Sequence, residues 1–122
     1  MKGVFGLLNE KFDWEDKRNI EVIKATAHVV FGKNYVLGEI KISDRPFTEF
    51  EWPMRIYDQF DVMLNYDRSI LGINLNVDGQ FLGLSRLTSK PVFRGFDAVK
   101  SENLLHNFKV LDEELKLRLG KN

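Results

Sequence analysis

The residues whose types and spacing suit chemistry are few in this chain of 122 residues. Glu49 and Glu51 are two positions apart, so on a strand they project from one face, where paired carboxylates can exchange protons with a substrate. The same pair also suits a solvated strand face that discourages edge-to-edge pairing, and we prefer this interpretation. The two histidines, His28 and His106, lack a second His or a carboxylate at the close spacing of a metal site. We therefore expect no enzyme activity, no metal and no cofactor.

Other catalytic patterns are also missing from the sequence. The serines lack the G-x-S-x-G pattern of a nucleophile elbow, and no glycine-rich segment matches a phosphate-binding loop or a dinucleotide fingerprint. The chain has no cysteine, which excludes thiolate nucleophiles, thiolate metal sites and disulfides. No apolar run is long enough for a membrane span or a signal-peptide core. We expect a cytoplasmic protein with no membrane partner.

Charge is balanced overall but unevenly distributed along the chain. The 18 basic and 18 acidic residues leave no overall field that would attract nucleic acid. Residues 44–67, however, hold six acids against two arginines, whereas residues 81–109 hold five bases against two acids. The basic segment matches no nucleic-acid-binding motif, so we expect no nucleic acid partner. The acidic segment instead suits a basic protein partner, because charge steers encounter and fixes register.

Aromatic residues are interleaved with the acidic segment, at Phe47, Phe50, Trp52 and Tyr57. Because positions 47, 50 and 52 do not keep one strand parity, we expect at least one ring to face outward. An exposed ring beside carboxylates would supply affinity when a partner buries it. The alternative is that the carboxylates are ordinary outward strand residues and the rings belong to the core.

The strand pattern that is clearest in the sequence is a hairpin at residues 70–87. Apolar residues alternate up to Asp78-Gly79 and resume beyond it, and this dipeptide suits a type I′ turn. The expected pairs are Val77 with Gln80, Leu75 with Leu82, and Ile73 with Leu84. The opposite face would then be polar, broken only by Phe81.

Further patterns predict the other strands. Residues 20–43 suggest a second hairpin that turns at residues 32–34, with His28 opposite Glu39 in one register. Residues 47–52 suggest an edge strand, because the prolines at 46 and 53 cannot donate ladder hydrogen bonds. Residues 60–66 alternate as well and join the 70–87 hairpin in a three-stranded meander.

The C-terminal segment predicts an amphipathic helix over residues 101–119. Its apolar stripe consists of Leu104, Phe108, Leu111, Leu115 and Leu119. Val110 and Leu117 fall on the opposite side, where they would contact either a partner or a covering loop.

These elements predict a single α+β domain spanning residues 1–122. We expect about six antiparallel strands in a strongly curved sheet or two-layer β arrangement, with the C-terminal helix packed on it. A full β-sandwich is the alternative.

In type, the chain resembles the small immunity proteins that bacteria encode beside the toxins of contact-dependent growth inhibition and related polymorphic toxin systems. The resemblance rests on a cysteine-free domain of this size and on the segments FGKNYVLGEIKI, FTEFEWPMRIYDQFD, NVDGQ and LLHNFKVLDEELKLRL. It implies a cytoplasmic protein, monomeric when free, that binds one cognate toxin domain, often a nuclease. Such a protein occludes the active site of the toxin without a cofactor or chemistry of its own.

The residues expected to contact a basic toxin domain are Glu49, Glu51, Trp52, Tyr57, Asp58 and Asp61. Their carboxylates would take the place of substrate phosphates against cationic groups in the toxin cleft. Two alternatives stay open. One is a small-ligand binding domain or minor enzyme with a cavity between sheet and helix. The other is a secretion or assembly chaperone that dimerises and presents an apolar groove at Val110 and Leu117.

Overall fold

The computed structural model describes residues 14–43, 49–67, 70–94 and 100–119 of the chain. The helices are α2 (Trp14–Phe31), α3 (Leu84–Leu87) and α4 (Ser101–Leu119). The strands are β1 (Tyr35–Leu37), β2 (Lys41–Ile42), β3 (Glu49–Ile56), β4 (Phe60–Asp67), β5 (Ile70–Val77) and β6 (Gln80–Gly83). All six strands belong to one antiparallel sheet in the order β1-β3-β4-β5-β6, with β2 also paired to β3.

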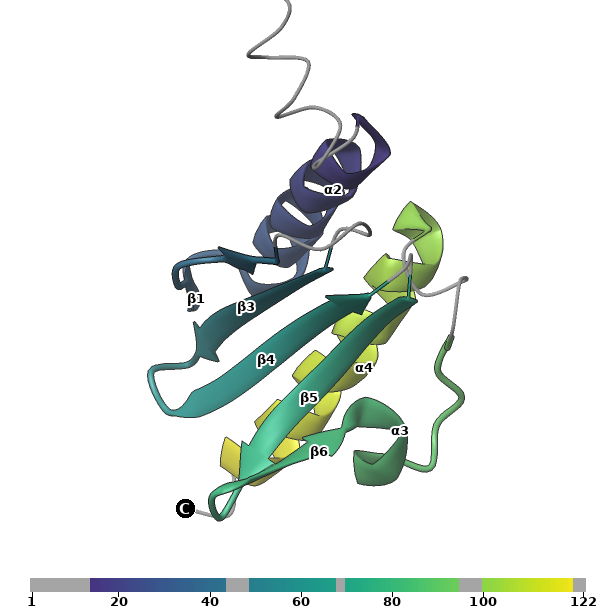
Figure 1. Cartoon of the computed structure of the whole chain (residues 1–122). Helices are drawn as coiled ribbons and strands as arrows, with labels where there is room; N and C mark the ends of the chain where they lie inside the picture. Colours follow the sequence, from purple (N-terminus) through teal and green to yellow (C-terminus); the bar gives the residue numbers. More distant parts are fainter. Residues whose placement is uncertain (1–13, 44–48, 68–69, 95–99, 120–122) are drawn as a thin grey trace, which may run out of the picture.

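The two long helices, α2 and α4, lie on the same face of this sheet and pack against each other (Figure 1). The expected α+β class, with six antiparallel strands and a C-terminal helix, is confirmed. Among the described strands, β1 and β6 are the two ends of this order and do not pair with each other. In the part of the chain that is described, no helix is long and apolar enough to cross a membrane.

The hairpin at Asp78-Gly79 forms as predicted over most of its length. Both turn residues have positive φ, 53° and 87°, as a type I′ turn requires. The expected pairs Val77–Gln80 and Leu75–Leu82 are present. The expected pair of Ile73 with Leu84 is wrong, because the chain leaves the sheet after Gly83 and forms the short helix α3. Leu84 is 5% exposed, so this turn places it in the core.

The expected hairpin over residues 20–43 is wrong in its first half, where the chain forms α2. The apolar residues in this segment fit a helical period as well as alternation. Ile23, Ala27 and Phe31, spaced by four, are at most 2% exposed and face the core. Val29, which alternation places on the same face, is 71% exposed. Gly32, at φ 60°, ends the helix in the left-handed conformation.

His28 is consequently a helix residue. The N–H of Gly32 donates to its backbone C=O at 3.0 Å, as expected at a helix C-terminus. Its ring contacts the ring of Tyr35 edge to face, with centroids 6.4 Å apart. The cross-strand pair with Glu39 is therefore wrong.

β3 is an interior strand, contrary to the edge position that its prolines suggested. It pairs along its whole length with β4, and β1 and β2 pair with its other side. Pro53 has no N–H to donate to a neighbouring strand. It is tolerated because the neighbouring strand is interrupted there, since residues 38–40 separate β1 from β2. There the N–H of Gly38 donates to the C=O of Pro53 at 2.8 Å. Pro53 is thus accommodated by an interruption in the neighbouring strand, and β3 does not need the edge position that was expected.

The core lies between the sheet and the two long helices. From the sheet it takes the alternate inward positions 50–56 of β3, 62–66 of β4 and 71–75 of β5. Four residues of the predicted α4 stripe, Leu104, Phe108, Leu111 and Leu115, are all 0% exposed, whereas Leu119 at the end of the helix is half-buried. The rings of Phe31 and Phe108, 5.7 Å apart, join α2 to α4.

Val110 and Leu117, both expected on the outer side of α4, differ in exposure. Val110 is 3% exposed and lies beside Val30 and Pro91, whereas Leu117 is 62% exposed. Val110 therefore belongs to the core and not to an exposed outer face of α4. Val110 and Leu117 do not share one exposed apolar patch, because only Leu117 is exposed.

Candidate partner-binding surface

The face of the sheet opposite α2 and α4 has no helix packed on it among the described elements (Figure 1). We call this surface the open sheet face. It consists of the odd positions 49–55 of β3 and 61–67 of β4, the even positions 70–76 of β5, and Val36, Lys41 and Phe81 on the outer strands. Alternation along each strand places these side chains outward when their neighbours enter the core. The open sheet face carries four carboxylates and two cations, Lys41 and Arg55.

Three of the carboxylates gather at one end of the open sheet face. Glu49 is directly opposite Asp67 in the β3–β4 register, and Glu51 is opposite Asn65. The Nδ2 of Asn65 lies 3.5 Å from Oε2 of Glu51, at the limit of a hydrogen bond. Lys41 is opposite Glu51 on its other side. This end of the face is acidic but includes one cation.

A polar bridge continues from this end toward β5. The Nδ2 of Asn74 donates to Oδ1 of Asn65 at 2.8 Å and lies 3.3 Å from the C=O of Met63. These contacts join β5 to β4 and orient both amides. The amide array can therefore act as a fixed set of donors and acceptors for a partner.

The fourth carboxylate, Asp61, lies at the opposite end of β4. It is directly opposite Arg55, whose Nη1 is 3.5 Å from its Oδ1. Both side chains are 54% exposed, so this pair contributes little to stability and can rearrange toward a partner. The Nη2 of Arg55 also donates to the C=O of Asp58 at 3.0 Å. Asp58 is exposed in the β3–β4 turn, at the rim of the open sheet face.

Trp52 does not lie on the open sheet face. It is 5% exposed, and its Nε1 donates to the C=O of Gly38 at 3.0 Å. Phe50 is 2% exposed and shares its strand parity, so both rings point toward the helices. Neither residue provides the outward ring that we expected from this segment. Two other residues of the segment, Asp44 and Phe47, lie outside the described residues.

Tyr57 is half-buried and faces α4. Its hydroxyl donates to Oδ1 of Asp112 at 2.5 Å. Burial raises the pKa of Tyr57 to about 12, and the hydrogen bond and negative charge of Asp112 act in the same direction. Tyr57 therefore stays protonated at neutral pH and ties the turn to the helix.

The exposed ring of the open sheet face is Phe81, which sequence reasoning identified only as a break in a polar pattern. It is 46% exposed and is opposite Asn76 in the β5–β6 register. Lys41, Asn65 and Asn74 were not among the predicted site residues. Lys41 is opposite Glu51, Asn65 lies 3.5 Å from Glu51, and Asn74 bonds to Asn65. The alternation of each strand was a usable signal, but only the register brings these residues together.

His106 is engaged by the backbone, with Nε2 2.8 Å from the C=O of Pro91 and its ring against Phe93. Within the described ranges, no group of three or more His, Cys, Asp or Glu side chains is placed to hold a metal ion. The groups that the open sheet face presents are carboxylates, two cations and side-chain amides.

Comparison with protein-family models, with curated protein sequences and with solved structures found no match to this chain.

Proposed function

We propose that this protein is an immunity protein that binds a cognate basic toxin domain, a nuclease, and neutralises it by occluding its active site. The observation that carries the proposal is the position of Glu49, Glu51 and Asp61 on one sheet face that no described helix covers. Asp58 extends this acidic surface at the β3–β4 turn.

The proposed mechanism is electrostatic mimicry. A nuclease cleft carries cationic groups that bind phosphates, and carboxylates held on a rigid strand can bind the same groups. The rigid backbone ladder of β3 and β4 fixes the spacing of the carboxylates, so little conformational entropy is lost on binding. Asp61 can exchange Arg55 for a cation of the toxin at small cost, because the existing pair is exposed.

Apolar groups on the same surface would supplement this charge contribution. Phe81 is 46% exposed, and Met63 is half-buried near the middle of the face. A partner that covers both would gain hydrophobic burial, which is the usual source of affinity at the centre of an interface.

The test is co-expression with the product of the adjacent gene, followed by growth measurement and purification of the complex. The variant carries Glu51→Gln and Asp61→Asn, which remove two charges from the open sheet face without changing side-chain size. The matched control carries Glu21→Gln and Glu113→Gln, which remove two charges from exposed positions on α2 and α4.

We expect the open-face variant to lose about tenfold or more in affinity, mainly through slower association that is sensitive to salt. The helix-side control should stay within about twofold of wild type. Growth inhibition that persists without any complex would refute the proposal. Equal weakening by both variants would refute the assignment of the binding face.

A further inference from the structure

The sheet has a half-covered edge at β5. The four residues of β6 pair only with residues 74–77, and the chain then turns away into α3. Residues 70–73 are therefore paired with β4 on one side, and no other described strand pairs with them on the opposite side. Residues flanking a two-residue turn exchange both backbone hydrogen bonds, and such pairs alternate along the ladder. Counting back from Val77, Leu71 and Ile73 both direct their backbone groups away from β4. Of these groups, the N–H and C=O of Leu71 and the N–H of Ile73 lie on the uncovered side.

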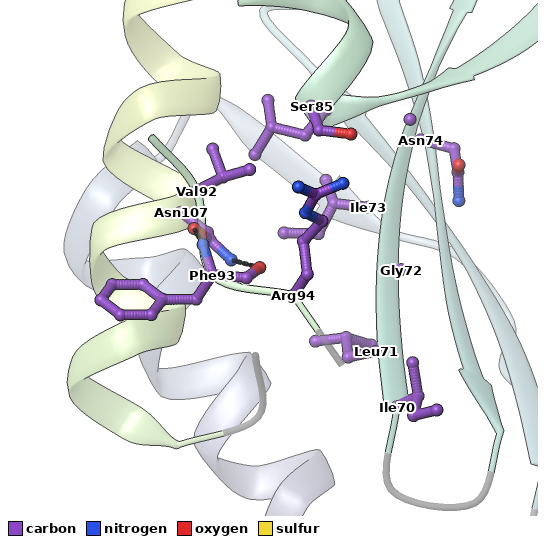
Figure 2. A pocket seen from close by; sticks show the side chains of 12 residues that line it. Ile70, Leu71, Gly72, Ile73, Asn74, Ser85, Val92, Phe93, Arg94 and Asn107 are labelled. Carbon is purple, nitrogen blue, oxygen red and sulfur yellow. Dashed lines mark hydrogen bonds between the residues drawn. The ribbon is translucent and has the colours of Figure 1, made fainter. Parts of the chain in front are cut away.

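This edge forms one wall of a cavity of about 270 Å³ (Figure 2). The segment 92–94 forms the facing wall, and Leu84 and Ser85 of α3 contribute as well. Asn107, 2% exposed on α4, holds the facing wall in place. Its Oδ1 accepts from the N–H of Phe93 at 2.9 Å, and its Nδ2 donates to the C=O of Phe93 at 3.0 Å. The groove is thus preformed, and most of its lining is apolar.

Arg94 provides the charge of the groove. Its side chain extends from the segment 92–94 into the space beside β5 (Figure 2). It is exposed, and no ion pair joins it to another residue in the part of the chain that is described. A guanidinium presents a planar set of donors that matches a carboxylate.

We infer that this groove binds an extended segment of a partner protein that carries a carboxylate, and that the segment adds to the sheet as a strand along residues 70–73. Its backbone bonds to Leu71 and to the N–H of Ile73. Alternate side chains of the segment enter the apolar space between β5 and Val92. Its carboxylate pairs with Arg94.

The backbone pattern favours a peptide strand over a small molecule. A strand edge repeats its donor and acceptor every two residues, roughly 7 Å apart, which is the repeat of another extended chain. A small carboxylate would pair with Arg94 but leave the groups of Leu71 and Ile73 without strand partners. The inference does not rest on the proposed function. The groove lies at the edge of the sheet and attracts a carboxylate, whereas the open sheet face attracts cations.

The test uses the full chain, labelled with ¹⁵N, and an end-blocked hexapeptide of sequence Val-Thr-Val-Asp-Val-Thr as the probe. Amide hydrogen exchange is measured with and without the peptide, and affinity is measured by fluorescence anisotropy. In the free protein, the amides of Leu71 and Ile73 should exchange quickly, whereas those of Gly72 and Asn74, which face β4, should be protected. At saturating peptide, exchange at Leu71 and Ile73 should slow by about tenfold or more.

The charge is tested with two matched protein variants and a probe without the carboxylate, and the backbone contacts are tested with an N-methylated probe. Arg94→Gln should weaken peptide binding by about tenfold, whereas Arg86→Gln, an equal charge change on α3 outside the groove, should change it by less than about twofold. A probe with asparagine in place of aspartate should lose the same factor with the wild-type protein and nothing further with the Arg94→Gln protein. A probe N-methylated at the amides that face the ladder should not bind.

Four results would overturn the inference. They are protection of Leu71 and Ile73 in the free chain, no probe binding up to millimolar peptide, undiminished binding of the N-methylated probe, and equal weakening by Arg86→Gln and Arg94→Gln. Undiminished binding of the N-methylated probe together with displacement by hexanoate would identify a site for small carboxylates instead. Failure of the toxin-binding test on Glu51 and Asp61 leaves all these readouts unchanged.

Discussion

The hydroxyl of Tyr57 donates to Oδ1 of Asp112 at 2.5 Å and so joins the β3–β4 turn to α4 across 55 positions of the sequence. The second carboxylate oxygen of Asp112 is 3.0 Å from Nζ of Lys116. Tyr57 has a φ of 55°, which is unusual for a tyrosine, and its N–H donates to the C=O of Asn34 at 2.7 Å. These contacts hold a strained turn in place. They also fix the position of Asp58 at the rim of the open sheet face.

Tyr57→Phe should lower the free energy of unfolding by about 1–2 kcal/mol, because it leaves a buried oxygen of Asp112 without its donor. Urea denaturation followed by circular dichroism measures the change. Tyr35→Phe is the control, because the ring of Tyr35 packs against His28 and Phe31 and should keep those contacts. A loss in the control as large as that at Tyr57 would contradict this assignment.

Stability should also depend on Tyr57 at high pH. The pKa of Tyr57 is raised in the folded protein from 10.0 to about 12, so the fold favours the neutral phenol. This contribution is complete below about pH 10 and is lost as the pH rises through about 12. The free energy of unfolding of the wild type should therefore fall more steeply over this window than that of Tyr57→Phe. Parallel curves for the two proteins would show that another group causes the decline.

The helical period of α2 can be tested with two alanine substitutions. Ile23→Ala should cost about 2–5 kcal/mol of unfolding free energy, because the side chain is 1% exposed. Val29→Ala should change it by less than about 0.5 kcal/mol, because Val29 is 71% exposed and alanine is the better helix former. A hairpin would place both residues on one face, so similar losses at the two positions would argue for strand structure.

Gly38 is expected to tolerate no side chain. A Cβ there would lie 2.9 Å from Cγ and 3.3 Å from the C=O oxygen of Pro53. Gly38→Ala should therefore lower the free energy of unfolding by about 1–3 kcal/mol. Gly83→Ala is the control, because its Cβ would lie 3.7 Å from Asn74 at an ordinary φ of −66°. Thermal denaturation compares the two, and a neutral Gly38→Ala would mean that β1 and β3 separate more easily than described.

The sequence by itself determined the elements whose signals are local. Asp78-Gly79 fits few turns other than type I′, so it determined a hairpin, and the regular alternation of β4 and β5 determined which of their side chains enter the core. The apolar spacing in α4 has one consistent helical interpretation. The same parity rule placed Glu49, Glu51 and Asp61 outward on their strands.

Tertiary structure decided what local patterns left ambiguous. The apolar residues at 23–31 fit two periods, and packing of Phe31 against Phe108 favours the helix, a contact between residues far apart in the sequence. Pro53 is interior only because a neighbouring strand is interrupted opposite it, and Trp52 is buried because helices cover that side of β3. Parity assigns side chains to two faces but cannot say which face the helices cover. Which face is covered depends on long-range burial of apolar surface. The same burial therefore determines which residues belong to the open sheet face.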